Sequence, residues 1–175
     1  MARAPTILAT IGLILSLYAL HVEHTQAAIE TAKESGIAGM EMDEYKSLCD
    51  IEALGASCSA TFALPEGRML SFFGLVPEKS MLDCPNAFLG ALYYTYVILY
   101  SMEITSAVFP LGLTFFANSM AMMSSVFLAY KLLVLKKLCL LCWTTHVLNF
   151  SLIFYYGRKM FFVSKKGENS KKKAA

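Results

Sequence analysis

Residues 136–150 read KKLCLLCWTTHVLNF, and they place two cysteines, a histidine and an asparagine in an otherwise mostly apolar stretch. The twenty residues from Leu138 to Gly157 are uncharged if His146 is neutral. This is the length of a membrane-spanning helix, which needs roughly 17–25 residues. Arg158 and Lys159 end the apolar stretch. The stretch therefore predicts a transmembrane helix at about 138–157 that carries an unusual set of polar side chains.

The composition of the whole chain is typical of an integral membrane protein. Of its 175 residues, 57% are hydrophobic and 16% are charged, and the mean hydropathy is +0.54. Soluble domains usually contain about 25% charged residues. We therefore expect one all-α integral membrane domain at 1–163 and a basic tail at 164–175. Because the basic residues flank a membrane helix, they indicate topology, and we expect no nucleic-acid partner.

Three further segments have the length and composition of transmembrane helices. An uncharged run that begins at Pro5 predicts a span at about 5–25, unless it is a cleaved signal peptide with Arg3 as its basic end. From 85 to 130 the single charged residue is Glu103, which predicts spans at about 85–102 and 106–130 with a tight turn between them. Together with the span at 138–157, the expected architecture is a four-transmembrane-helix bundle.

The distribution of charge predicts the orientation of this bundle. Seven of the last 18 residues are lysine or arginine and one is acidic, so the C-terminus belongs in the cytosol. Four spans then place the N-terminus in the cytosol as well. The loop at 26–84 faces the lumen, and ten acidic and four basic residues lie within 30–83. The aromatic and apolar residues of this loop predict a cap that folds back onto the membrane surface.

The polar residues of the last span form one stripe. Cys139, Cys142, His146 and Asn149 are spaced 3, 4 and 3 residues apart, and this spacing places them on one face of a helix. A C-x-x-C pair can close a disulfide and release two electrons. Cations near a helix N-terminus favour the reactive thiolate, and two lysines precede Cys139 closely. The alternative is that the stripe lines a seam and hydrogen-bonds to neighbouring helices.

A second pair of cysteines lies in the expected luminal loop. Cys49 and Cys58 are separated by eight residues, and Cys84 is left over. Because thiol–disulfide exchange passes electrons through mixed disulfides, a relay can run from a luminal thiol donor through this pair to the C-x-x-C pair, and then to a substrate in the lipid such as a quinone. The alternatives are a structural disulfide and a zinc site built from both pairs. We expect no metal, because one pair lies at membrane depth.

The chain resembles the vitamin K epoxide reductase family from about residue 5 to 159. The matching segments are "LCD" at 48–50, "SCS" at 57–59, Phe62, "FG" at 73–74, Asn86, Gly90, "YYT" at 93–95 and "CLLCWTTHVLNF" at 139–150. The resemblance implies a four-helix bundle around a quinone pocket, capped by the luminal loop. It implies reduction of vitamin K from epoxide to quinone and from quinone to hydroquinone, with vitamin K as substrate and no tightly bound cofactor. The implied partners are membrane lipid, a luminal thioredoxin-like thiol oxidoreductase and coumarin-type inhibitors.

The resemblance also assigns roles to single residues. Cys142 would attack the substrate, Cys139 would resolve the adduct and exchange with Cys58, and Cys49 would take electrons from the luminal partner. His146 stands where the family usually has a tyrosine that donates to the quinone, and we expect it to polarise the quinone carbonyl in the same way. The loop cysteines are also spaced more widely than is typical of the family. The residues implied to contact the quinone are Asn86, His146, Phe62, Tyr93 and Tyr94.

The C-terminal sequence and the relay together predict location and function. The chain ends in KKKAA, with Lys172 and Lys173 fourth and third from the end. This looks like a dilysine signal, and predicts a multi-pass protein of the endoplasmic reticulum membrane with both termini in the cytosol. Two other functions stay open: a quinone-coupled enzyme that works mainly to form disulfides, and a non-enzymatic tetraspan scaffold with structural loop cysteines.

Overall fold

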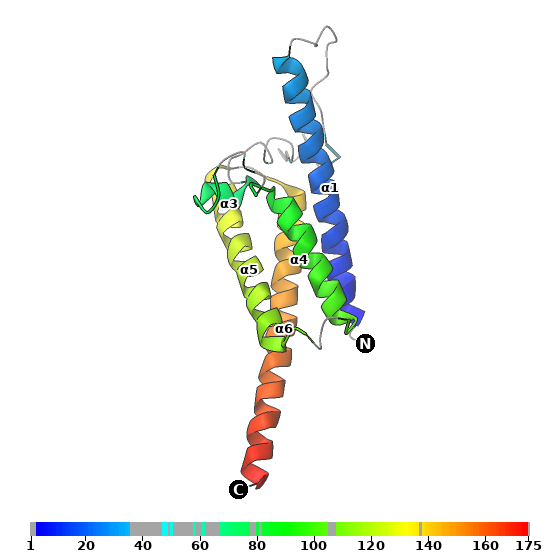
Figure 1. The fold of residues 1–175 in the computed structure, drawn as a ribbon, viewed down its shortest axis with the longest axis vertical. Helices are drawn as coiled ribbons and strands as arrows, with labels where there is room; N and C mark the ends of the chain where they lie inside the picture. Colours follow the sequence, from blue (N-terminus) through cyan, green and yellow to red (C-terminus); the bar gives the residue numbers. More distant parts are fainter. Residues whose placement is uncertain are drawn as a thin grey trace.

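The computed structural model describes residues 3–35, 47–48, 50, 58, 61, 67–77, 80, 82–104, 108–136 and 138–174, which contain helices and no strand. The long helices are α1 (Arg3–Glu34), α4 (Asn86–Ser101), α5 (Leu111–Val134) and α6 (Leu140–Ala174), and α3 (Met69–Phe72) is short. α1 packs along α4 and also contacts α6, while α5 packs along α6. Contact between α4 and α5 is slight. Figure 1 shows α3 beside the ends of α4 and α5 where α6 begins.

The long helices bury polar residues and expose apolar ones. Thr114 and Asn118 of α5 are completely buried, whereas Ile7, Ile14 and Phe116 are 58%, 60% and 60% exposed. Large exposed apolar surfaces are unfavourable in water, but in lipid the polar groups are the ones that need internal partners. Among the described residues, two helices are long and apolar enough to cross a membrane, over Ala4–Ile29 in α1 and Leu111–Val134 in α5. The outer surface therefore fits a lipid environment.

Proline marks the beginning of two helices. Pro85 is the N-cap residue of α4, and Pro110 is the N-cap residue of α5. Proline lacks an N–H and restricts the residue before it, so it is tolerated at helix starts and not in helix interiors. α4 thus coincides closely with the span expected at 85–102, whereas α5 begins later than the span expected at 106–130. Between them Glu103 takes a left-handed conformation with φ of 66°, consistent with a turn.

α1 and α6 extend beyond the spans expected at 5–25 and 138–157. α1 continues through the segment AAIETAKE, whose alanines and glutamates favour helix. α6 passes through Gly157 and the basic residues to Ala174, because one glycine costs a helix only about 1 kcal/mol. Figure 1 shows the C-terminal end of α1 and the C-terminal end of α6 projecting from opposite ends of the bundle.

Glycines allow α1 and α4 to approach closely. A Cβ atom on Gly12 would lie 2.4 Å from the ring of Tyr94, and one on Gly90 would lie 2.9 Å from Oγ of Ser16. Tyr94 is 2% exposed and belongs to a buried cluster that also contains residues of α1 and α6. The absence of a side chain at Gly12 thus makes room for an aromatic ring that belongs to the wall of the site described below.

Candidate thiol–disulfide site and its cavity

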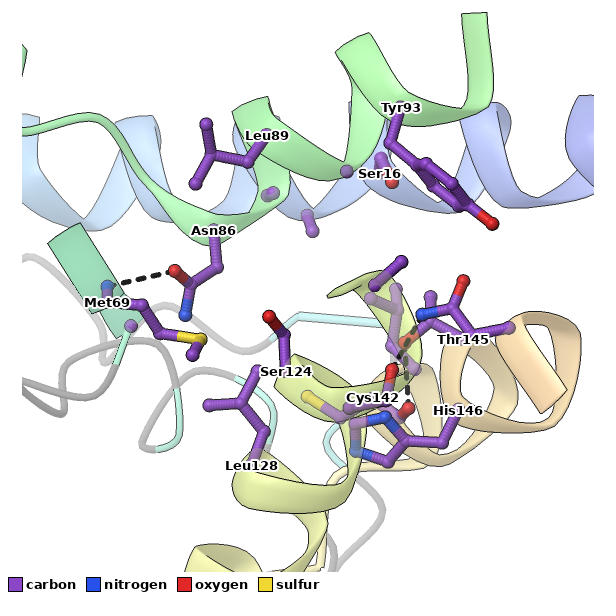
Figure 2. Close-up of a pocket in the computed structure, with 18 of the residues that line it drawn as sticks. Ser16, Met69, Asn86, Leu89, Tyr93, Ser124, Leu128, Cys142, Thr145 and His146 are labelled. Carbon is purple, nitrogen blue, oxygen red and sulfur yellow. Dashed lines mark hydrogen bonds between the residues drawn. The ribbon is translucent and has the colours of Figure 1, made fainter. Parts of the chain in front are cut away.

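A cavity of about 440 Å³ is lined by residues of α1, α4, α5 and α6 near the beginning of α6 (Figure 2). Its volume lies within the usual range for small-molecule sites, about 300–1,000 Å³. Five residues that the sequence singled out line this cavity, together with Asn149 from the same stripe: Cys142, His146, Asn86, Tyr93 and Tyr94. The structure therefore brings the beginning of α4 and the stripe of α6 to one cavity.

Cys139 lies next to Cys58, outside the lining of the cavity. Its Sγ is 3.5 Å from Sγ of Cys58 and accepts a hydrogen bond of 3.3 Å from the backbone N–H of Cys142. Cys58 and Cys139 are both completely buried. Cys58 is disulfide-bonded, whereas Cys139 and Cys142 are free thiols. A thiolate this close to a disulfide sulfur can attack it and form a mixed disulfide.

Some predicted residues fall outside this geometry. Cys49 and Phe62 lie outside the described residues, as does Lys137, so their roles stay predictions. Lys136 is exposed in the turn after α5, where its φ is 52°. Cys84 is a free thiol in the segment before α4, and it is absent from the cavity lining.

His146 lines the cavity without a hydrogen-bond partner among the described residues. Both of its ring nitrogens are buried, and its ring packs edge-on against Trp143 with the centroids 5.7 Å apart. Figure 2 shows His146 beside Cys142 on α6. A buried imidazole without partners is unfavourable. A ligand in the cavity that accepts a hydrogen bond would therefore stabilise this side chain.

Asn86 connects the cavity to the loop. Its Oδ1 accepts a hydrogen bond of 2.9 Å from the backbone N–H of Met69 at the beginning of α3, as Figure 2 shows. α4 has no side-chain cap, since its N-cap residue is Pro85. The amide of Asn86 therefore serves to join α3 to α4 at the cavity, and does not cap its own helix.

Polar residues of α5 form hydrogen bonds with side chains of the cavity wall, although they were not recognised from the sequence. The hydroxyl group of Tyr93 donates to Oδ1 of Asn118 over 2.7 Å, and Nδ2 of Asn149 donates to Oγ of Ser125 over 2.6 Å. A signal was present, because Asn118 and Ser125 are seven residues apart in a mostly apolar span. This spacing places two polar groups on one helix face.

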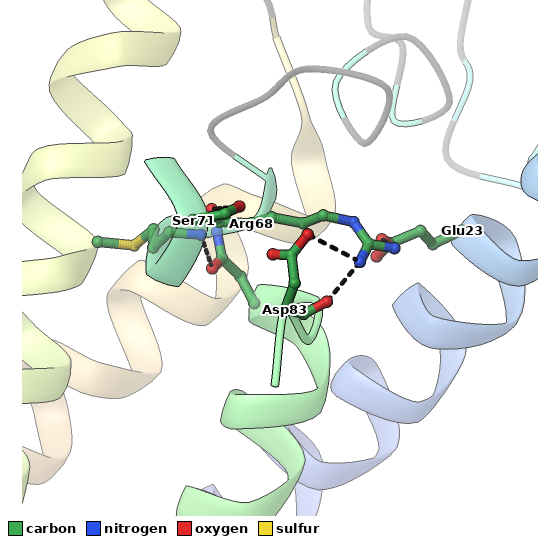
Figure 3. A network of polar contacts seen from close by, with 6 residues as sticks. Glu23, Arg68, Ser71 and Asp83 are labelled. Carbon is green, nitrogen blue, oxygen red and sulfur yellow. Dashed lines mark hydrogen bonds and ion pairs between the residues drawn. The ribbon is translucent and has the colours of Figure 1, made fainter. Parts of the chain in front are cut away.

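An ionic network holds the described part of the loop at the end of the bundle (Figure 3). The guanidinium group of Arg68 donates to the backbone oxygen of Asp83, lies 3.7 Å from the Asp83 carboxylate and lies 3.5 Å from the Glu23 carboxylate. Glu23 belongs to α1 and lines the cavity. The network therefore ties α1 to the segments before α3 and α4.

An aromatic cluster holds α3 against α5. The rings of Phe72 and Phe73 lie 5.8 and 5.0 Å from the ring of Phe127, measured between centroids. The ammonium group of Lys131 lies 5.2 Å from the centroid of Phe72, a distance at which cation and ring attract each other. Since Lys131 also lines the cavity, the cluster lies at its edge.

Cys139 contacts a disulfide, and Cys142 of the same C-x-x-C pair lines a ligand-sized cavity. This arrangement is typical of an oxidoreductase that uses thiol–disulfide exchange, and the apolar outer surface suits a membrane. Residues 4–156 match the vitamin K epoxide reductase family, and the chain belongs to this family. It is 32% identical over 154 residues to vitamin K epoxide reductase complex subunit 1 of Mus musculus, covering 85% of this chain and 84% of that protein. The identity to the Rattus norvegicus protein of the same name is 30%, with the same coverage. The resemblance to this family is thus confirmed. Membership supports a vitamin K epoxide reductase-like activity at the level of the family.

Proposed function

We propose that the chain reduces vitamin K epoxide and vitamin K quinone with electrons from thiols. Membership of the family supports the substrate class. One observation carries the proposal: Sγ of Cys139 is 3.5 Å from Sγ of the disulfide-bonded Cys58, while its C-x-x-C partner Cys142 lines the cavity. The C-x-x-C pair thereby connects an electron-carrying disulfide to a site that can hold a quinone.

Electrons enter through the loop pair. A luminal thioredoxin-like thiol donor reduces the Cys49–Cys58 disulfide, and the thiolate of Cys58 then attacks Cys139 in the oxidised C-x-x-C pair. Cys49 resolves the mixed disulfide, so that the loop disulfide reforms and Cys139 and Cys142 leave as thiols. The described state, with Cys58 in a disulfide and Cys139 and Cys142 free, corresponds to the enzyme after this transfer and before the substrate step.

The substrate step uses the thiols of the C-x-x-C pair. Cys142 attacks the substrate, and Cys139 then attacks Cys142 to close the disulfide. Two thiols provide two electrons and two protons, so quinone becomes hydroquinone. With the epoxide as substrate, the same dithiol yields quinone and water. This balance requires no metal and no tightly bound cofactor.

His146 and Asn86 orient the quinone by hydrogen bonds to its oxygens, and Tyr93, Tyr94 and Phe62 pack against the ring. The buried ring nitrogens of His146, which have no partner among the described residues, support a donor role. A donor aimed at a developing oxyanion typically contributes about 10²–10³-fold to the rate. His146 would then perform the task of the tyrosine that the family usually has there. Coumarin-type inhibitors would compete for the same cavity.

In this proposal α1, α4, α5 and α6 cross the endoplasmic reticulum membrane, with both termini in the cytosol and the loop capping the cavity on the luminal side. The basic C-terminal sequence and its KKKAA ending support this orientation. The 16 residues of α4 are few for a span. The N-terminal end of α4, however, contacts α3, since Oδ1 of Asn86 accepts a hydrogen bond from the backbone N–H of Met69.

A second function uses the same relay. If quinone reduction served mainly to form disulfides in luminal proteins, the contact between Cys58 and Cys139 would be equally necessary. Activity on the epoxide separates the two functions, because a disulfide-forming enzyme needs quinone only. The scaffold alternative does not account for a free C-x-x-C pair at a ligand-sized cavity.

The test is turnover of vitamin K epoxide by the purified full-length chain in lipid nanodiscs with dithiothreitol, with the quinone product measured by chromatography. We expect turnover that is abolished by Cys142→Ala and retained by Cys84→Ser, the matched cysteine outside the cavity. Turnover by Cys142→Ala at the parent rate would remove Cys142 from the mechanism. Turnover of quinone without turnover of epoxide would favour the disulfide-forming enzyme.

A further inference from the structure

The carboxylate of Asp50 binds the backbone at two places in the loop, at Ser47 and at Cys58. Its Oδ2 accepts a hydrogen bond of 2.9 Å from the N–H of Ser47, and its Oδ1 accepts one of 2.6 Å from the N–H of Cys58. Hydrogen bonds to a carboxylate are shorter and stronger than bonds between neutral groups. One side chain therefore links Ser47 to Cys58 and fixes the backbone of a cysteine whose sulfur contacts Cys139.

Tyr18 anchors the same segment to α1. The N–H of Leu48 donates a hydrogen bond of 2.9 Å to the hydroxyl oxygen of Tyr18. Tyr18 packs against the buried cluster that contains Cys58 and Cys139. The side chain of Leu48 is 89% exposed and so contributes little packing. Hydrogen bonds to Tyr18 and Asp50, and not burial of the Leu48 side chain, therefore position this part of the loop.

We propose that Asp50 is a positioning residue for electron transfer, whose carboxylate holds Cys58 with its Sγ 3.5 Å from Sγ of Cys139. The inference rests on the proposed function in one respect, since it takes the exchange between Cys58 and Cys139 to be a step of the relay. Asp50 acts through the backbone of Cys58 and not on the substrate. Exchange requires the attacking sulfur in contact with the disulfide, and a displacement of about 1 Å can slow such a step about 100-fold.

The exchange can be measured without any substrate. In a Cys142→Ala, Cys84→Ser background, the thiolate of Cys139 attacks Cys58 in the loop disulfide. The Cys58–Cys139 bond forms, the bond from Cys58 to its predicted partner Cys49 breaks, and Cys49 leaves as a thiolate that takes up a proton. There is no net oxidation. A maleimide that alkylates the released thiol makes the step irreversible, and mass spectrometry of the linked peptides without reduction gives its rate.

In this background Asp50→Asn should lower the rate of Cys58–Cys139 bond formation about 10- to 100-fold. An amide has one oxygen, so it cannot accept both hydrogen bonds in the same way. Asp50→Glu keeps the carboxylate and should restore part of the rate. Glu103→Gln is the control, because it also replaces a carboxylate by an amide, but at an exposed residue in the turn after α4. Its rate should stay close to that of the parent.

Thermal unfolding and the disulfide state of Cys58 report whether each variant folds. A folded Asp50→Asn variant that links Cys58 to Cys139 at the parent rate would overturn the positioning role. If Asp50→Asn does not fold, the deciding variant is Asp50→Glu, which keeps both acceptor oxygens but moves them by one methylene group. Asp50→Glu should link Cys58 to Cys139 more slowly than the parent, and a rate equal to that of the parent overturns the positioning role. Failure of the proposed function looks different, because the parent would then exchange normally and leave vitamin K epoxide unreduced.

Discussion

The hydroxyl group of Tyr94 donates a hydrogen bond to Oδ1 of Asn149 over 2.9 Å, and this bond joins α4 to α6 at the wall of the cavity. Nδ2 of Asn149 donates in turn to Ser125 and thereby reaches α5. Between helices in lipid there is little hydrophobic driving force, so small residues and hydrogen bonds contribute a large share of the packing. The amide of Asn149 thus links three helices around the site.

Removing this bond should destabilise the protein. Tyr94→Phe removes the hydroxyl group that donates to Oδ1 of Asn149. Because this oxygen lies inside the bundle, the loss should lower the free energy of unfolding by about 1–2 kcal/mol. Unfolding followed in detergent measures the difference. Tyr100→Phe is the control, because Tyr100 is also buried and its hydroxyl group makes no hydrogen bond among the described residues. Equal losses in both variants would contradict a specific role of the bond.

The close approach of α1 to α4 should not tolerate a side chain at Gly12. Gly12→Ala places a Cβ atom 2.4 Å from the ring of Tyr94, so the ring must move, and such overpacking typically costs about 1–3 kcal/mol. At Gly112 in α5 a Cβ atom would meet nothing within 4 Å. Gly112→Ala should therefore be neutral or slightly stabilising in the same unfolding measurement. A stable Gly12→Ala variant with unchanged turnover would refute this account of the interface.

Replacement of His146 should affect the substrate step. His146→Phe removes both ring nitrogens and should lower kcat for quinone reduction about 10²–10³-fold. His146→Tyr restores a hydroxyl donor and should recover much of the rate. Thr144→Val, on the exposed face of the same helix, should leave the rate unchanged. If His146→Phe reduces quinone as fast as the parent, the histidine has no part in polarising the carbonyl.

The cysteines should differ in their reaction with a maleimide. Cys139 is completely buried and should be protected, whereas Cys84 is partly exposed and should react first. Cys142 should react at an intermediate rate because it lines the cavity, and bound vitamin K quinone should slow it. Mass spectrometry of labelled peptides measures each rate, with the unfolded protein as the reference. Rapid labelling of Cys139 in the folded protein would contradict the described burial.

Much of the site was predictable because it depends on local sequence patterns. The spacing of Cys139, Cys142, His146 and Asn149 predicts one helix face, and all but Cys139 line the cavity. The helix boundaries differ from the bounds of the expected spans, since hydropathy ignores capping. Pro110 delays the start of α5, and Gly157 does not end α6. Whether all four long helices cross the membrane, and whether the loop caps the cavity, stay predictions.

The amino-acid sequence by itself determined the family and the helical class and predicted which cysteines react, because motif spacing and hydropathy are properties of neighbouring residues. Only the tertiary structure decided which distant groups meet. It placed Sγ of Cys58 3.5 Å from Sγ of Cys139. It also formed the hydrogen bonds from the backbone N–H of Cys58 to Asp50 and from the hydroxyl group of Tyr94 to Asn149. The physical reason is that such contacts depend on how helices pack and where loop backbone finds hydrogen-bond partners, and neither is encoded in the spacing of residues along one helix.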